Sequence, residues 1–152
     1  MKCEAGNKCK GGIKTECDPG THSPEGSAAC FPCTPGTLAA SPGASTCTAC
    51  EPGHMCNSTT STECEVGYFA PGNSTTCQAC PQGRYTPSRG ASYCRGCPGG
   101  YQCSGSEKVL CSAGHFSPEF SDECSLCLDG TYTQSAGQFT GFRYFLIFSL
   151  FP

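Results

Sequence analysis

A cysteine pattern that repeats every 47 residues constrains this chain more than any other feature. Its unit is C-x5-C-x7-C-x12-C-x2-C-x13-C-x2, and nearly three copies are present. A period of this length is typical of tandem structural repeats. We therefore divide the chain into repeats at residues 1–49, 50–96 and 97–137, the last one incomplete, followed by a non-repeat tail at 138–152.

The chain has few residues with which to build an apolar core. Only eleven Leu, Ile, Val or Phe precede residue 138, while ordering each residue costs about 1–2 kcal/mol of backbone entropy. Seventeen cysteines in 152 residues exceed the share at which a short chain is a disulfide scaffold. We therefore expect a small disulfide-rich fold, an elongated tandem array of short irregular β-hairpin modules with little regular secondary structure.

A second pattern, CxxG, starts at nine cysteines in register. Its glycines predict turns just after anchored cysteines, because glycine accepts a positive φ without strain. A further turn is expected at the far end of each loop, where Gly43, Gly90 and Gly137 recur at the period. Two residues beyond the CxxG glycine there is usually a bulky side chain, which we expect to cover a sulfur bridge. These side chains are His22, Leu38, Phe69, Tyr85, Phe116 and Tyr132.

The simplest pairing that obeys the repeat is a ladder, in which each in-register CxxG cysteine bonds to the next cysteine along the chain. Bridges closing loops of roughly fifteen residues stabilise a fold by about 3 kcal/mol each in the chain-entropy model. The ladder leaves one thiol, Cys127, unpaired. Its pairs are Cys3-Cys9, Cys17-Cys30, Cys33-Cys47, Cys50-Cys56, Cys64-Cys77, Cys80-Cys94, Cys97-Cys103 and Cys111-Cys124.

A crossed scheme obeys the period equally well. It pairs Cys30 with Cys47 and Cys33 with Cys50. We favour the ladder because crossing leaves three cysteines unpaired instead of one, namely Cys3, Cys124 and Cys127.

Zinc is a competing use of the same cysteines. Two segments spell CxxC-x13-CxxC, a spacing that suits a tetrahedral site of four thiolates. However, Cys56 and Cys64 recur just as faithfully and lie outside the quartet. The quartets are Cys30, Cys33, Cys47 and Cys50, and Cys77, Cys80, Cys94 and Cys97. We therefore favour structural disulfides and expect no metal site.

Catalysis has little support in the sequence. A thioredoxin-type CxxC needs a helix N-terminus in an α/β frame, and the chain lacks helical periodicity before residue 138. His22, His54 and His115 lie on short repeat loops without a nucleophile motif. We expect no enzyme, no catalytic residues and no cofactor.

Two sequons favour an extracellular or cell-surface location. Asn57-Ser58-Thr59 and Asn73-Ser74-Thr75 contain two of the chain's three asparagines, so N-linked glycans are expected at Asn57 and Asn73. The Ser and Thr run at 57–63 is a candidate for O-linked glycans. The net charge is −3 with no basic stripe, which argues against nucleic acid. A secretory signal is not present in this segment, so we expect a fragment or a mature segment.

The modules CPQGRYTPSRGASYC and CEVGYFAPGNSTTC resemble the cysteine-rich modules of tumour necrosis factor receptors and of ephrin-receptor-like repeats. The resemblance covers residues 3 to about 137 and implies bonds from Cys80 to Cys94 and from Cys64 to Cys77. Long runs of such modules also occur in protist surface glycoproteins, including the flagellar hairs called mastigonemes, which this chain is similar to in its regularity. The CxxCxxC clusters of ligand-binding receptors are missing here.

This resemblance favours a structural glycoprotein that builds a filament, flagellar hair or coat through self-association or contact with other surface glycoproteins. The alternative is a ligand-binding fragment of a receptor ectodomain.

The tail departs from the repeat. The period requires a cysteine at 141, where Gly141 stands, and six of the fifteen aromatic residues fall in the last fourteen positions. Its apolar stretch is too short for a bilayer, which takes about twenty residues, so no direct membrane span is expected. We interpret the tail as a product of truncation or of translation into an intron. The alternative is an interaction segment that adds an aromatic strand to a neighbouring subunit.

Overall fold

The computed structural model describes residues 2–129, 131–132, 136–137 and 142–143. Within these residues the chain forms two-stranded antiparallel sheets and no helix, as expected for a small disulfide-rich fold. Among the described residues there is accordingly no helix that could cross a bilayer. The chain divides into two compact units, unit 1 with Met1–Ala79 and Ser88–Tyr93, and unit 2 with Cys80–Pro87 and Cys94–Pro152.

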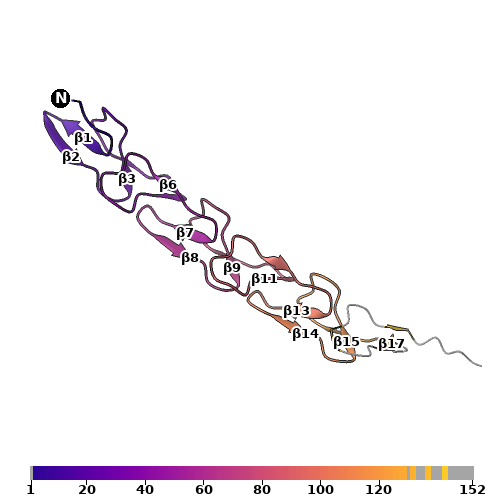
Figure 1. The fold of residues 1–152 in the computed structure, drawn as a ribbon. Coiled ribbons are helices and arrows are strands. Elements are labelled where there is room, and N and C mark those ends of the chain that lie inside the picture. Colours follow the sequence, from indigo (N-terminus) through magenta and orange to yellow (C-terminus); the bar gives the residue numbers. More distant parts are fainter. Residues whose placement is uncertain (1, 130, 133–135, 138–141, 144–152) are drawn as a thin grey trace, which may run out of the picture. The chain divides into compact units, whose positions relative to one another are not determined.

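Unit 1 consists of five hairpins that follow one another in chain order (Figure 1). The longest pairs Asn7 with Glu16 and Lys10 with Ile13 at its two ends. Its strand pairs are β1 (Asn7–Lys10) with β2 (Ile13–Glu16), β3 (Thr21–His22) with β4 (Phe31–Pro32), β5 (Thr37–Leu38) with β6 (Thr48–Ala49), β7 (His54–Cys56) with β8 (Ser61–Glu63), and β9 (Tyr68–Phe69) with β10 (Gln78–Ala79).

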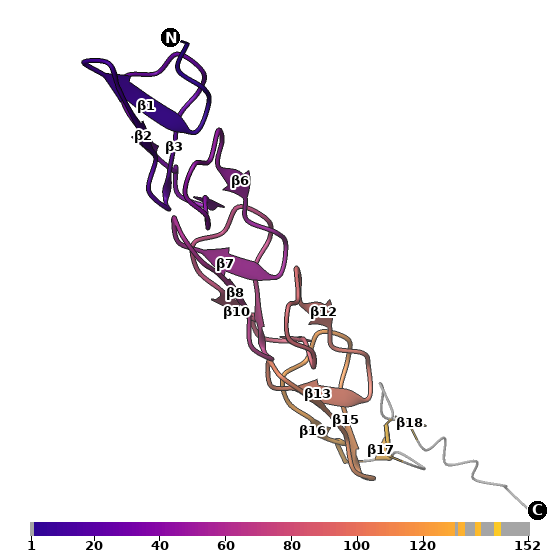
Figure 2. The same ribbon diagram turned by 60° about the vertical axis from the view of Figure 1, so that its left-hand side comes forward.

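Unit 2 contains four hairpins of the same kinds (Figure 2). The last of them keeps the repeat register at the backbone, because Thr131 pairs with Arg143 as Thr37 pairs with Ala49. The strand pairs of unit 2 are β11 (Arg84–Tyr85) with β12 (Arg95–Gly96), β13 (Tyr101–Cys103) with β14 (Lys108–Leu110), β15 (His115–Phe116) with β16 (Ser125–Leu126), and β17 (Thr131–Tyr132) with β18 (Phe142–Arg143).

Most of the buried apolar residues in both units are half-cystines. Of the twelve buried apolar residues in the described part of the chain, nine are half-cystines, and the others are Ala39, Ala70 and Tyr85. Two serines are fully buried as well, and their hydroxyls donate to backbone carbonyls, Ser23 to Asn7 at 2.9 Å and Ser117 to Tyr101 at 2.7 Å. Bridges therefore occupy the place that hydrocarbon side chains hold in ordinary domains.

Loop tips pack directly on CxxG glycines. A Cβ on Gly53, which has a φ of 84°, would lie 2.1 Å from the carbonyl oxygen of Gly90. The amide of Gly90 donates to the carbonyl of Cys64 at 2.8 Å. This contact, which we call the glycine lock, recurs in unit 2, where a Cβ on Gly83 would lie 1.9 Å from the carbonyl oxygen of Phe120. At these locks the loop tip packs against an earlier part of the chain through backbone atoms.

The two units do not follow the repeat boundaries predicted from the sequence. The division falls inside the second repeat, at Cys80, and Ser88–Tyr93 returns to unit 1. The predicted repeats describe the period of the sequence. That each repeat is a separate domain stays a prediction. The predicted tail lies outside the described residues except for the backbone of Phe142–Arg143.

Candidate functional sites on the disulfide ladder

The structure contains eight disulfides, and they are the pairs of the ladder, not those of the crossed scheme. Each bridge closes one small loop, with a Cα–Cα distance of 5.7–5.8 Å and sequence separations of 6, 13 or 14 residues. Such a density of bridges indicates an oxidising environment of the extracellular type. The bridges are Cys3–Cys9, Cys17–Cys30, Cys33–Cys47, Cys50–Cys56, Cys64–Cys77, Cys80–Cys94, Cys97–Cys103 and Cys111–Cys124.

The four cysteines of the first zinc-like quartet are distributed over three different bridges. Cys33 bonds to Cys47 within the quartet, whereas Cys30 bonds to Cys17 and Cys50 to Cys56. Sulfurs held this way are not thiolates, the form in which cysteine binds metal.

Cys127 is the one described cysteine outside the ladder. Its thiol is free and partly exposed. Its equivalents Cys33 and Cys80 bond to cysteines 14 residues later, a distance that would place the partner at Gly141. Cys127 is therefore free because its partner position in the repeat is occupied by Gly141 and not by a cysteine.

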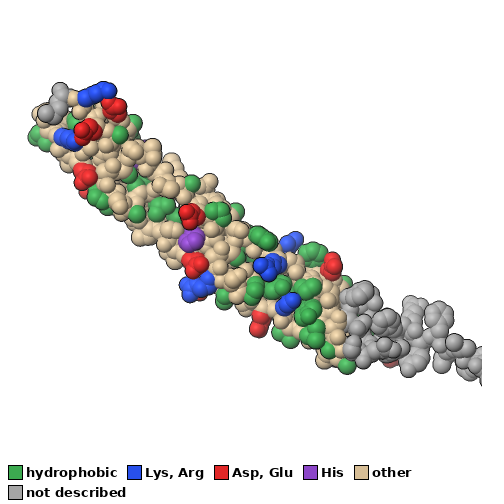
Figure 3. Space-filling view, viewed as in Figure 1, with side chains coloured by type: hydrophobic (Ala, Val, Ile, Leu, Met, Phe, Trp, Pro, Cys, Tyr) green, Lys and Arg blue, Asp and Glu red, His purple; other side chains and the backbone are tan. Residues whose placement is uncertain are grey.

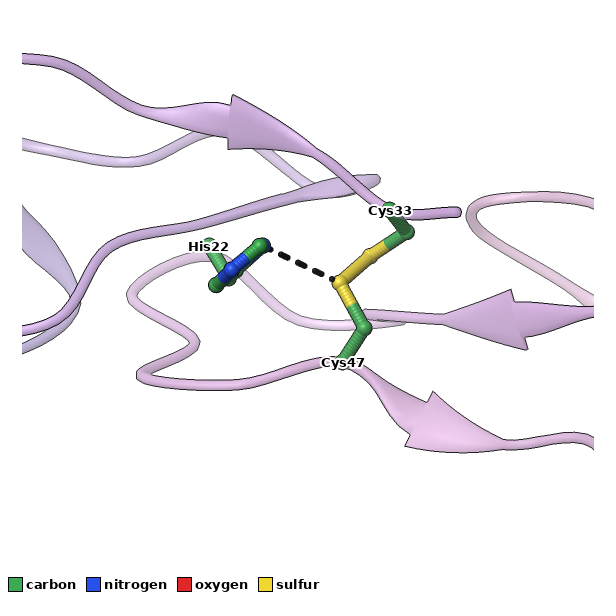
Figure 4. A group of neighbouring side chains, drawn as sticks. All are labelled: His22, Cys33 and Cys47. Carbon is green, nitrogen blue, oxygen red and sulfur yellow. Dashed lines mark hydrogen bonds between the residues drawn. A yellow bond between two sulfur atoms is a disulfide. The ribbon is translucent and has the colours of Figure 1, made fainter. Parts of the chain in front are cut away.

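One bridge has a histidine beside it (Figure 4). His22 lies on β3, and its Nδ1 is 3.3 Å from Sγ of Cys47. Cys47 forms its disulfide with Cys33. Because a disulfide sulfur carries no hydrogen, the imidazole N–H donates in this contact. The ring of Phe31 lies 6.2 Å from the imidazole, tilted by 50°. The histidine thus covers a bridge, as the sequence predicts, and also offers it a proton donor.

The other two histidines lack such a contact with sulfur. Nδ1 of His54 lies 3.4 Å from the carbonyl of Pro52, and Nδ1 of His115 lies 3.2 Å from the hydroxyl of Ser112. The sequence places all three histidines on short repeat loops, and of the three only His22 stands at a predicted covering position. The signal that separates His22 is its repeat position, where the second and third repeats carry Phe69 and Phe116.

A buried aromatic side chain fulfils the covering role in unit 2. Tyr85 is buried and packs with the half-cystines Cys97 and Cys103, with Tyr101 beside them. The predicted covering residues therefore differ in burial, since Leu38, Phe69 and Phe116 are only partly buried.

The two sequons differ in backbone geometry. Asn57 is exposed, and its Oδ1 accepts hydrogen bonds from the amides of Thr59 and Thr60 and from the hydroxyl of Thr59, at 2.7–3.0 Å. This Asx turn presents the sequon on a loop. Asn73 is also exposed but has a φ of 62° and forms a glycine lock with Gly36. Both side chains lie where a glycan would extend into solvent.

Charged side chains form exposed pairs in unit 1. Arg89 pairs with Glu65 at 2.6 Å and with Glu63 at 3.5 Å. A hydrogen bond and the positive charge from Lys14 hold the pKa of Glu4 below its usual value. Exposed pairs of this kind contribute little to stability.

Unit 2 exposes five large apolar side chains, which we refer to together as the repeat-three surface. Figure 3 shows apolar and basic side chains gathered over the part of unit 2 that carries β13 and β14. The guanidinium of Arg84 lies 5.2 Å from the ring centre of Phe120, and the ammonium of Lys108 lies 4.6 Å from that of Tyr101. The members of the surface are Val109, Leu110, Phe120, Leu126 and Leu128, which are 46–76% exposed.

Comparison with known proteins adds no family to this description. No family model and no curated protein matches the chain.

Proposed function

We propose that this chain is a structural, non-catalytic extracellular glycoprotein that serves as a building block of a cell-surface filament, flagellar hair or coat. The observation that carries the proposal is the uniformity of its modules. The same bridge spacings of 6, 13 and 14 residues recur through the chain. A building block needs such repeated, locally braced modules more than it needs one specialised pocket.

The glycan sites support the same proposal. Asn57 and Asn73 are both exposed, on loops in which a sugar displaces no buried side chain. N-linked glycans would keep a chain with exposed apolar residues soluble during secretion. The proposed partners are other copies of the chain or other surface glycoproteins.

The proposal is tested with the full chain secreted from eukaryotic cells behind a heterologous leader. We expect sedimentation analysis to show assemblies that grow with concentration, and electron microscopy to show ordered polymers. Enzymatic removal of N-glycans should convert Asn57 and Asn73 to aspartate, with Asn57→Gln and Asn73→Gln as controls. A chain that stays monomeric and unglycosylated would contradict the proposal.

A second candidate function, ligand binding by a receptor ectodomain, is favoured by the repeat-three surface. Its exposed apolar side chains, together with Arg84 over the ring of Phe120 and Lys108 over the ring of Tyr101, have the composition of a protein-binding surface. This candidate predicts that a soluble extracellular protein binds the monomeric chain tightly. A structural role predicts instead that the same residues contribute to assembly.

A further inference from the structure

The Cys33–Cys47 bridge differs from the other seven in its exposure. Every other bridge of the ladder has at least one buried half-cystine, whereas Cys33 and Cys47 are both partly exposed. The closest equivalent, Cys80–Cys94, has the same sequence separation but a Cys94 that is only 6% exposed. Access of an attacking thiolate to sulfur governs disulfide exchange. Cys33–Cys47 is therefore the bridge of the described ladder in which neither half-cystine is buried.

The same bridge is the one with a proton donor at one of its two sulfurs. Nδ1 of His22 lies 3.3 Å from Sγ of Cys47, and the histidine ring nitrogen and the two sulfurs all lie within 4.8 Å of one another. A thiolate leaves faster from a disulfide when its negative charge is stabilised. The contact thus marks Cys47 as the leaving sulfur and Cys33 as the sulfur that is attacked.

We propose that Cys33–Cys47 is a thiol-exchange site for low-molecular-weight thiols of the glutathione class, with His22 as the proton donor to Cys47. The thiolate attacks Sγ of Cys33, so that a new sulfur–sulfur bond forms there as the bond to Cys47 breaks. The electron pair of the broken bond stays on Cys47. The protonated imidazole gives its Nδ1 proton to that thiolate and becomes neutral. A second thiol then releases Cys33 as a thiol, and the two small thiols leave joined as their own disulfide.

Opening this bridge leaves its loop attached by backbone contacts. The amide of Gly43 donates to the carbonyl of Cys17 at 2.8 Å, and the amide of Ser23 donates to the carbonyl of Ala44 at 3.1 Å. Neither bond involves Cys33 or Cys47. Exchange at the site is therefore local, and the mixed disulfide on Cys33 forms as an intermediate on a unit that stays folded.

The test uses the full oxidised chain carrying Cys127→Ser, which removes the chain's own free thiol. The protein is exposed to limiting glutathione, quenched with an alkylating agent and mapped by peptide mass spectrometry. We expect glutathione on Cys33 and alkylation on Cys47 before either appears at Cys80 or Cys94. Intact mass before exposure must show eight bridges in every variant.

Two variants separate proton donation from simple accessibility. His22→Phe introduces the residue found at positions 69 and 116, and it should slow exchange at Cys33 about a hundredfold. His22→Gln keeps an N–H group but cannot transfer a proton, so it should also exchange more slowly than the parent. The proposal is overturned if another bridge opens first, or if either variant exchanges at the parent rate.

Discussion

The second and third repeats build the same hairpin with different surfaces. Thr62 and Glu63 at the end of β8 are replaced by Val109 and Leu110 at the end of β14, yet the two hairpins keep the same strand pairing. Leu110 lies over Gly137 in unit 2 just as Glu63 lies over Gly90 in unit 1. The backbone depends on half-cystines and glycines, so the exposed positions are free to change.

At the loop tips, too, the backbone conformation is kept while the side chain changes. Equivalent tips carry Gly26, Asn73 and Phe120, and all three have a positive φ between 62° and 81°. Asn73 and Phe120 accept this strained conformation because backbone contacts on both sides fix the tip. The ring of Phe120 packs against Gly96 and Arg84, so even a phenylalanine is tolerated at the tip. On the glycine side of the lock no side chain has room.

The largest effect is therefore expected at a locked glycine. Gly53→Ala combines a positive φ with a Cβ 2.1 Å from a carbonyl oxygen, and it should destabilise unit 1 by about 4 kcal/mol or more. Hydrogen exchange of the Gly90 amide, which bonds to Cys64, measures this loss directly.

Gly26→Ala is the matched control, because Gly26 has a φ of 81° but nothing within 4 Å of a built Cβ. It should cost only about 1 kcal/mol. Equal effects at both glycines would show that backbone strain alone, and not the lock, decides stability.

A smaller gain is expected from completing the ladder. Gly141→Cys supplies the half-cystine that the period requires for Cys127, and a bridge closing a loop of this size stabilises by about 3 kcal/mol. The retained β17–β18 register should allow the bond to form. Intact mass should fall by two hydrogens, and thermal unfolding should shift upward. A thiol that still reacts with alkylating agents would contradict the expectation.

The smallest effect on stability is expected at the repeat-three surface. Giving it the residues of the second repeat, with Val109→Thr, Leu110→Glu, Leu126→Ala and Leu128→Pro, should change the free energy of unfolding by about 0.5 kcal/mol or less per substitution. Association of the chain, or its binding to a ligand, should nevertheless be lost.

The reverse change, Thr62→Val with Glu63→Leu in the second repeat, is the control and should create new association. If sedimentation shows unchanged association in both variants, the repeat-three surface contributes to neither of the two proposed functions.

Much of the fold follows from the sequence, because the main stabilising elements are covalent and periodic. The hairpins and the turns at Gly43, Gly90 and Gly137 arise from spacing. Spacing leaves two pairings open, and the ladder is the one that strands a single thiol. The partners in the glycine locks could not be found this way, since Gly53 meets Gly90 through a carbonyl and no side-chain pattern records that contact.

The candidate site was also only partly visible in the sequence. Equal spacing made Cys33–Cys47 and Cys80–Cys94 look alike, and their difference in burial depends on three-dimensional packing. The sequence predicts His22 as a covering residue, but its orientation toward Cys47 is a property of the folded loop.

The glycine locks also govern how such a protein can change its length. Gly36 of the first repeat meets Asn73 of the second, so the contact is lost whenever the number of residues between them changes. Duplication or loss of a complete 47-residue segment restores every contact, whereas a partial insertion separates its partners. Gene variants of this kind should therefore differ by whole multiples of the period.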